Sequence, residues 1–358
     1  MSGVCIRVDA YPEIGYGHLK RCLVIAKCFY ERGEEVCFIL VGDSVAAAEI
    51  KRAGFDLIKT SKETSFSKQI DTIKLYNFEN IGITIIDIAH SRAIQDSGGL
   101  ALYLEELTKK SFTVLIDSFG VQSVRENSPK FSCNILVSPY VGEQKSTKKT
   151  SYTELLGVDY FVLDAAYHNY RKKSIRKLAN KILITCGGSD PSSISSKILY
   201  ALNSDEKRNF DIKVIVGSGF SSKLNEILFK LVECGPHNVD LVKSPDNLSS
   251  EMSWCDIAIS TSGLTKYELS ATGTPTILIS IDSNHDAVNQ YFVREKSVVD
   301  LGDVKDLTDI KLLNNIWMLL ENADERGRQS LVGQNLIDGN GSVNLVEEIL
   351  KIKNDVVN

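Results

Sequence analysis

The sequence lacks any long hydrophobic run. No apolar stretch in its 358 residues approaches the roughly 20 residues that a membrane-spanning helix needs. The opening residues, MSGVCIRVDA, have no charged segment followed by an apolar one, so we interpret them as a first strand and not as a secretion signal. We therefore expect a cytoplasmic protein that does not insert into membranes.

An excess of basic charge is also missing. The formal net charge is −5, and the Lys-rich stretch 144–149 is short and surrounded by polar loop residues. Proteins that bind nucleic acid usually carry a basic stripe or patch that neutralises phosphates. The sequence therefore predicts no nucleic-acid partner, and the short basic stretch is interpreted as a solvated loop.

Cysteine motifs are absent although cysteines are not. The chain has eight cysteines, but no two of them form a C-x-x-C pair, and no Cys/His spacing is typical of zinc. Most lie inside apolar patterns such as "VCFIL" and "KILITC". We expect free, buried thiols in a reducing compartment, and neither a metal nor another cofactor.

Two common nucleotide-binding motifs are missing as well. The chain has no G-x-x-x-x-G-K-[ST] phosphate loop. The segment "GYGHLK" begins like a dinucleotide fingerprint, but Lys20 stands where its third glycine is required. A dinucleotide cofactor is therefore not predicted, although Gly15 and Gly17 would still let a ligand approach the backbone.

What the chain does have is a regular alternation of strand-like and helix-like segments. Near-continuous apolar runs rich in Val and Ile are typical of parallel strands covered on both faces. Their alternation with amphipathic stretches predicts a doubly wound α/β architecture. The expected strands are 4–9, 35–41, 82–87, 112–116, 134–137, 160–163, 181–186, 212–217, 256–260 and 275–281.

The length predicts two domains. A polar segment with a basic end separates the strand at 134–137 from the one at 181–186, so we place the boundary near residue 170. The expected domains are 1–170 and 171–358, and the amphipathic last helix belongs to the second or crosses back onto the first. Ligands of open α/β sheets bind beyond the carboxyl ends of strands, which points to a cleft between the two halves.

One histidine attracts attention in the first half. The strand "IRVD" ends at Asp9, and an amphipathic helix opens near Gly17, so His18 lies in the first turn of that helix. The free N–H groups and positive dipole of a helix start attract anions and favour a neutral imidazole. His18 is thus either a general base at the edge of the cleft or a polar residue of the helix start with no chemistry.

The segment "IRVDAYPEIGYGHLKRCLVIA" resembles the opening of the UDP-sugar hydrolases of pseudaminic acid biosynthesis and of the related spore-coat polysaccharide proteins. That family is similar in turn to the glycosyltransferase that makes lipid II. The resemblance continues in "LITCGGSD", "DIAISTSGLTKYELSATGTPTILISI" and "DSNHDAVNQYF", and it is weakest between residues 42 and 180. It implies a GT-B-like fold, with two Rossmann-like doubly wound domains facing a central cleft.

The resemblance also implies an activity. It implies hydrolysis of UDP-2,4-diacetamido-2,4,6-trideoxy-β-L-altropyranose at the anomeric carbon with inversion and without a metal. His18 matches the histidine proposed to activate water, and Asn284 matches an asparagine in the sugar site.

The nucleotide site is implied in the second half. Glu268 matches the acidic residue that binds the ribose hydroxyls in GT-B enzymes, and a matching turn places amides on the pyrophosphate. Amides at a strand-to-helix turn suit that role physically. The turn consists of Ser262, Gly263 and Leu264. The further candidate substrate-binding residues are Asp9, Gly15, Gly17, Arg21, Asp87, His90, Gly187, Gly188 and His285.

Two positions depart from the hydrolase pattern. Ala89 stands where the pattern D-x-Y has a tyrosine, and Asp164 stands where Y-x-L-[LI]-R-x-E-F has an arginine. These departures leave a glycosyltransferase with a hydroxyl acceptor as the alternative. A non-catalytic nucleotide-sugar-binding protein and a UDP-sugar 2-epimerase are further possibilities. We expect a monomer.

Overall fold

The computed structural model describes residues 3–61, 64–75, 81–118, 123–127, 131–146, 150–243, 245, 248–261 and 263–357. The chain divides into two compact units, each described here by itself. Unit 1 comprises Met1–Leu163 and Asn340–Asn358, and unit 2 comprises Asp164–Gly339. The division thus falls before the expected residue 170, and the last helix lies in unit 1, which is one of the two alternatives left open by the sequence.

Unit 1 is built on a seven-stranded sheet with the order β3-β2-β1-β4-β5-β6-β7, in which every pairing is parallel. The order reverses between β1 and β4, which makes this pair the topological switch point of the sheet. The strands are β1 (Gly3–Ala10), β2 (Val36–Gly42), β3 (Asp56–Thr60), β4 (Ile81–Asp87), β5 (Phe112–Ile116), β6 (Ile135–Ser138) and β7 (Thr153–Leu156).

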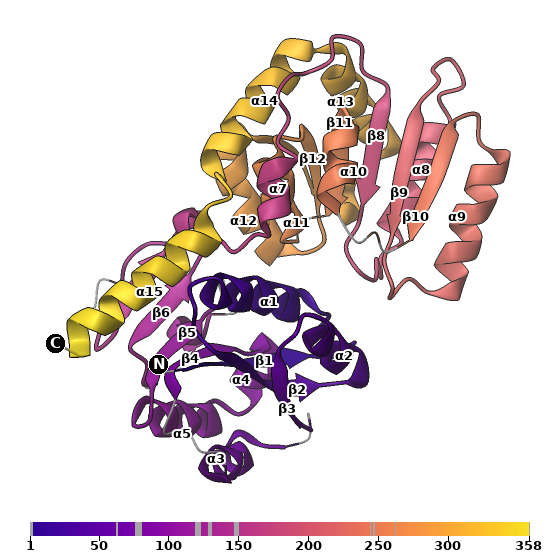
Figure 1. Ribbon diagram of the computed structural model, residues 1–358. Helices are drawn as coiled ribbons and strands as arrows, with labels where there is room; N and C mark the ends of the chain where they lie inside the picture. Colours follow the sequence, from indigo (N-terminus) through magenta and orange to yellow (C-terminus); the bar gives the residue numbers. More distant parts are fainter. Residues whose placement is uncertain are drawn as a thin grey trace. The chain divides into compact units, whose positions relative to one another are not determined.

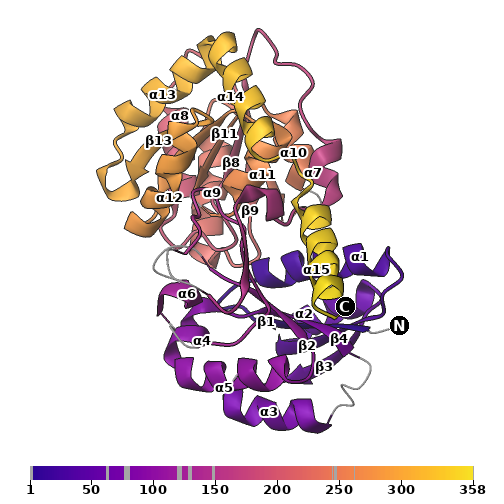
Figure 2. The ribbon, with the colours of Figure 1, turned by 90° about the vertical axis from the view of Figure 1, so that its left-hand side faces the viewer.

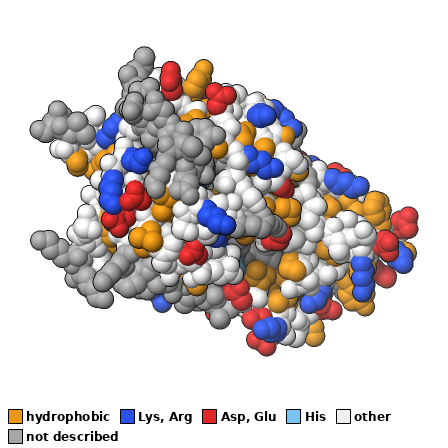
Figure 3. All heavy atoms as spheres, turned by 90° about the horizontal axis from the view of Figure 1, so that it is seen from below, with side chains coloured by type: hydrophobic (Ala, Val, Ile, Leu, Met, Phe, Trp, Pro, Cys, Tyr) orange, Lys and Arg blue, Asp and Glu red, His pale blue; other side chains and the backbone are white. Residues whose placement is uncertain are grey.

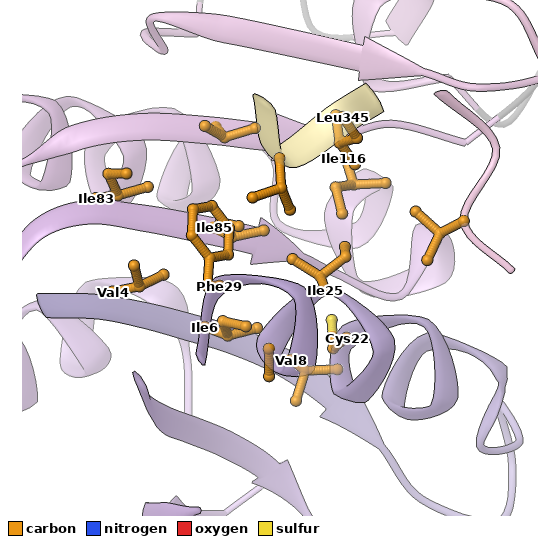
Figure 4. Packing of buried hydrophobic residues seen from close by; sticks show 14 of the residues in the cluster. Val4, Ile6, Val8, Cys22, Ile25, Phe29, Ile83, Ile85, Ile116 and Leu345 are labelled. Atoms are coloured by element: carbon orange, nitrogen blue, oxygen red, sulfur yellow. The ribbon is translucent and has the colours of Figure 1, made fainter. Parts of the chain in front are cut away.

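Helices cover both faces of this sheet. On one face α1 packs over β1 and β4 together with the last helix, α15 (Figures 1 and 2). Alternate residues of a strand point to opposite faces. Val4, Ile6 and Val8 accordingly face α1 (Figure 4), and Cys5 packs with the buried side chains of α5 on the other face. The helices are α1 (Gly17–Tyr30), α2 (Ser44–Arg52), α3 (Phe66–Leu75), α4 (His90–Gln95), α5 (Ser97–Thr108), α6 (Val124–Asn127) and α15 (Gly341–Val357), with a 3-10 turn, η3 (Val158–Tyr160).

Unit 2 repeats the plan with six parallel strands in the order β10-β9-β8-β11-β12-β13. Its switch point lies between β8 and β11. The strands are β8 (Lys181–Thr185), β9 (Asp211–Val216), β10 (Asn238–Lys243), β11 (Ile257–Thr261), β12 (Thr276–Ser280) and β13 (Val298–Asp303).

The helices of unit 2 also form two layers. Helices α8, α9 and α13 bury one face of the sheet, and α10 and α11 bury part of the other. The helices are α7 (Ala165–Asn169), α8 (Ile194–Asn203), α9 (Ser222–Cys234), α10 (Leu248–Trp254), α11 (Thr265–Thr272), α12 (Ser283–Arg294), α13 (Asp309–Glu321) and α14 (Ala323–Leu336), with a 3-10 turn, η4 (Val304–Asp306).

One expected strand is wrong. Residues 160–163 form no strand: Tyr160 ends the 3-10 turn η3, and residues 161–163 follow it as irregular backbone. They are apolar because they pack against the start of α15. Leu163 donates its N–H to the Ser342 hydroxyl over 3.1 Å and accepts from it over 2.6 Å. The side chains of Phe161 and Leu163 are accordingly buried without belonging to a sheet.

The distribution of charged side chains on the surface agrees with the charge balance of the sequence. Among the coloured side chains of Figure 3, Lys and Arg are interspersed with Asp and Glu and form no continuous basic patch on that face. Within the described ranges, no helix combines the length and apolar content that crossing a membrane requires.

Candidate active site

His18 stands at the switch point of unit 1. β1 ends at Ala10, and the loop that follows is held by a backbone bridge between Tyr11 and Gly15. α1 begins at Gly17 without a side-chain cap and without an acidic residue in its first turn. The first N–H groups of α1 therefore stay available to a ligand next to His18, whose side chain is 22% exposed.

The imidazole is held by a buried carboxylate. The distance between Nδ1 of His18 and Oδ1 of Asp87 is 2.6 Å, and only 1% of the Asp87 side chain is exposed. Because Asp87 is ionised, Nδ1 of His18 carries the proton and donates a hydrogen bond to Asp87. This assigns Nε2 as the basic nitrogen of His18, which is the tautomer that a general base needs.

Arg21 holds Asp87 in turn. One turn along α1 from His18, its Nε and Nη2 donate to the two carboxylate oxygens of Asp87 over 2.8 and 2.7 Å. Burial opposes ionisation of Asp87, but the charges and hydrogen bonds of Arg21 and His18 outweigh it, so the pKa of Asp87 lies well below its usual value. Arg21 balances the buried charge, and the pair fixes the orientation and tautomer of His18.

Asp87 and Arg21 were predicted to bind substrate, and the structure gives them another environment. Asp87 is buried, and both its oxygens contact His18 or Arg21. Both residues hold the histidine in place. Arg21 also donates to the Tyr140 hydroxyl over 3.1 Å. Tyr140 was missed by the sequence analysis, although it lies in the loop after a predicted strand, which is where ligand-site residues of α/β sheets gather.

Asp9 requires a correction. Its side chain is fully buried, with Oδ1 accepting from Arg7 over 2.5 Å and Oδ2 accepting from the backbone N–H of Ala89 over 2.9 Å. Asp9 is thus a structural carboxylate that joins the ends of β1 and β4, and not a ligand-facing group. Ala89 is buried as well, so the missing tyrosine of the hydrolase pattern leaves no gap at this position. His90 begins α4, but its side chain lies outside the described part of the structure.

The second set of candidates lies at the switch point of unit 2. Gly187 and Gly188 follow β8, and Gly263 follows β11, the neighbouring strand. Gly188 and Gly263 have ordinary φ angles, and a Cβ added to either would meet no atom within 4 Å. The described fold therefore does not require glycine at these two positions, and close approach of a ligand is a physical reason for it.

α11 offers N–H groups in the same place. It begins at Thr265, and its N-cap residue, Leu264, makes no side-chain cap hydrogen bond. Ser262 lies outside the described residues. Glu268 is half-exposed in the first turn of α11. A helix start next to a glycine turn can bind a phosphate through its N–H groups.

α12 carries the last predicted residues. Asp282 caps it by accepting from the backbone N–H of His285 over 2.9 Å, and Nδ1 of His285 lies 2.8 Å from the same oxygen. Asn284 belongs to the first turn of α12, but its side chain lies outside the described part of the structure. Its role in the sugar site stays a prediction.

Unit 2 also contains a lysine that the sequence analysis missed. Lys266 is 2% exposed, and its Nζ donates to Oδ1 of Asn289 over 3.0 Å. Burial lowers its pKa to about 7, although Asp300 partly offsets this. The signal was present, because helical spacing places Lys266 on the same face of α11 as the buried Leu269 and Ser270.

No metal site is evident in the part of the chain that the structure describes, since no three His, Cys, Asp or Glu side chains there are grouped to hold an ion. The expected independence of metal stays a prediction.

The chain is similar to known glycosyltransferases in sequence over most of unit 2 and in fold over its whole length. Residues 181–333, which run from β8 into α14, match the glycosyltransferase family 28 C-terminal domain. The crystal structure of Acinetobacter baumannii MurG superimposes with a TM-score of 0.68 at 14% identity, covering 98% of this chain and 100% of that one. The calicheamicin glycosyltransferase CalG4 gives 0.66 at 10% identity, with 100% of both chains covered.

The chain has a GT-B-like fold. The predicted pair of Rossmann-like domains is thereby confirmed, and the nucleotide-binding segment expected between 256 and 281 lies within the matched glycosyltransferase family 28 domain.

Curated relatives are similar to the chain in sequence over part of their length. Methanocaldococcus jannaschii "Uncharacterized protein MJ1062" is 27% identical over 77% of this chain and 55% of the relative. The spore coat polysaccharide biosynthesis protein SpsG of Bacillus subtilis is 24% identical over 52% of the chain and 55% of the relative. The chain thus spans about half the length of these relatives.

One relative carries the name of the expected reaction. Helicobacter pylori "Pseudaminic acid cytidylyltransferase and UDP-2,4-diacetamido-2,4,6-trideoxy-beta-L-altropyranose hydrolase" is 28% identical over 56% of this chain and 34% of the relative. The GT-B-like chain is therefore similar to nucleotide-sugar enzymes and polysaccharide biosynthesis proteins.

Proposed function

We propose that this GT-B-like chain hydrolyses a UDP-linked diacetamido-trideoxy sugar at the anomeric carbon and releases UDP, as a step of nonulosonic (pseudaminic) acid biosynthesis. The observation that carries the proposal is the contact of His18 Nδ1 with the buried Asp87, over 2.6 Å, with Arg21 on both oxygens of that carboxylate. An imidazole with a fixed tautomer and a partly exposed ring suits the deprotonation of water. The name of the Helicobacter pylori relative supports the choice of substrate.

The reaction needs one proton transfer and one displacement. The oxygen of water forms a bond to the anomeric carbon, and the bond from that carbon to the oxygen of the β-phosphate breaks. The electron pair of the broken bond leaves with UDP, and Nε2 of His18 accepts a proton from the attacking water. Attack from the face opposite the leaving group inverts the anomeric configuration.

Unit 2 supplies the nucleotide site in this proposal. The N–H group of Leu264, at the start of α11, counters the charge that develops on the diphosphate, whereas the N–H of Gly263 donates to the carbonyl of Thr261 over 2.9 Å in this structure. Gly187 and Gly188 let the ligand approach the backbone, and Glu268 accepts hydrogen bonds from the ribose hydroxyls. Asn284 and His285 contact the sugar. No step in this scheme requires a metal.

The test is incubation of the protein with UDP-2,4-diacetamido-2,4,6-trideoxy-β-L-altropyranose in ¹⁸O-water, followed by NMR and mass spectrometry. We expect label in the released sugar, unlabelled UDP, and an initial product of inverted configuration. Replacing the histidine, His18→Asn, should slow release by about 10²–10⁴-fold, which is the usual contribution of a general base. His168→Asn is the matched control, because His168 is exposed on the short helix α7 of unit 2.

The other outcomes are equally clear. Binding of the UDP-sugar without release, followed by release when a hydroxyl acceptor is added, would replace the hydrolase with a glycosyltransferase. Turnover of His18→Asn within about threefold of wild type would remove His18 from the mechanism. Failure to bind any UDP-sugar would overturn the proposal as a whole.

A further inference from the structure

The segment that opens unit 2 is attached to the predicted nucleotide helix, α11. Asp164 caps α7 by accepting from the backbone N–H of Ala166 over 2.8 Å. Beyond α7, the backbone N–H of Lys172 donates to the carbonyl of Thr272, the last residue of α11, over 2.8 Å. The chain from 164 to 172 therefore packs against α11 and is hydrogen-bonded to the last residue of that helix. Asp164, which replaces the arginine of the hydrolase pattern, is the residue that starts α7.

Tyr167 is the side chain that α7 brings to α11. Its ring packs against the cluster formed by Met252, Leu269 and their neighbours, and its hydroxyl is hydrogen-bonded to Glu268. Burial raises the pKa of Tyr167 well above its usual value, and the negative charge of Glu268 raises it further. The phenol is therefore neutral, so it is the donor and the Glu268 carboxylate is the acceptor.

We propose that Tyr167 is a positioning residue for Glu268, which it holds in the orientation that accepts hydrogen bonds from the ribose of a bound uridine diphosphate. This inference rests on the proposed nucleotide site in unit 2, and it does not depend on whether water or another hydroxyl attacks the sugar. A carboxylate accepts up to about four hydrogen bonds, so the one from Tyr167 fixes the side chain without exhausting it.

The energetic reason is pre-organisation. Glu268 is half-exposed in the first turn of a short helix, and a glutamate has several rotatable bonds. Ordering such a side chain at the moment of binding lowers affinity by about two- to tenfold, which is the cost of immobilising one flexible side chain. Tyr167 is ordered by its own packing, and its hydrogen bond orders Glu268 before the nucleotide binds.

The test compares Tyr167→Phe with wild type in titration calorimetry with UDP, 2′-deoxy-UDP and 3′-deoxy-UDP. Phenylalanine keeps the ring and removes the hydroxyl. We expect wild type to prefer UDP over at least one deoxy analogue, and Tyr167→Phe to bind UDP about two- to tenfold more weakly while that analogue changes less. In turnover assays KM should rise with kcat unchanged. Tyr170→Phe is the matched control, because Tyr170 lies in the same segment and is 39% exposed.

A second variant separates this role from a general effect on folding. In a Glu268→Ala background, Tyr167→Phe should have no further effect on UDP affinity, because the residue acts only through Glu268. Equal weakening of UDP and both deoxy analogues would show that the hydroxyl supports the fold, and it would overturn the positioning role.

The outcomes also separate this inference from the proposed function. If wild type binds UDP and Glu268→Ala weakens binding but Tyr167→Phe does not, the inference fails alone. If wild type binds UDP with the expected dependence on Tyr167 but releases no sugar into water, the hydrolase proposal fails and the positioning role stands. If wild type does not bind UDP, both fail.

Discussion

Replacing Asp87 with asparagine tests the arrangement around His18 most directly. The carboxylate accepts from Nδ1 of His18 over 2.6 Å and from Nε and Nη2 of Arg21 over 2.8 and 2.7 Å. An amide of the same shape has one acceptor oxygen, and its NH₂ group would face a donor. Either His18 or Arg21 must therefore lose its partner.

The loss of either partner has a measurable effect, on kcat in one case and on folding free energy in the other. If His18 loses its acceptor, its Nδ1–H tautomer is no longer enforced, and kcat should fall by about 10²–10⁴-fold, as for loss of the base itself. If Arg21 loses its counter-charge, a buried guanidinium is left unpaired, which costs up to about 3–5 kcal/mol of folding free energy. The activity of Asp87→Asn must accordingly be measured where urea unfolding shows the variant to be folded.

The assay is UDP release in the absence of acceptor, and the control is another buried aspartate. Asp256 in unit 2 accepts from Nε of Arg176 over 2.7 Å and from two backbone N–H groups, so Asp256→Asn also weakens a charged pair without touching His18. We expect it to lower stability and leave kcat close to wild type. A folded Asp87→Asn enzyme with kcat within about threefold of wild type would refute the reasoning.

Two further substitutions test one buried side chain in each unit. Lys266→Met removes a buried amine of pKa about 7. Between pH 7 and about 10 that amine is neutral in the folded protein but charged in the unfolded chain, so the free energy of unfolding of wild type should rise relative to the variant by about 1.4 kcal/mol per pH unit in that window and not change below it. Urea unfolding at pH 6, 7.5 and 9 measures this. Leu345→Ala creates a cavity where α15 packs on unit 1 and should lower the free energy of unfolding by about 2–5 kcal/mol, measured by the same method.

The central strands of both sheets could be predicted from the sequence, and the strands at the sheet edges could not. The strands missed are β3 and β7 in unit 1 and β10 and β13 in unit 2, and each stands at the edge of its sheet. A central strand is covered on both faces and reads as a continuous apolar run. An edge strand is partly exposed, as the alternating burial of Asn238–Lys243 illustrates, so its composition resembles that of a loop.

The candidate site was partly predictable for a related reason. Residues that follow a strand and open a helix, such as His18 and Gly263, can be found because their place in the chain defines their place in the sheet. The pairing of His18 with Asp87 joins residues 69 positions apart, and the burial of Asp9 depends on Arg7 and Ala89. Such contacts follow from the register of β1 against β4, which a single sequence does not encode locally.

The course of the chain through unit 1 affects how the protein can be made. Residues 340–358 complete a unit whose other part is residues 1–163, and the whole of unit 2 lies between these two parts in the sequence. During synthesis, at about 5–20 residues per second, the ribosome finishes unit 2 while the core around β1 still lacks Leu345, Val346 and Ile349. The half of the protein that carries His18 is therefore completed only after unit 2, although its first strand is made before unit 2.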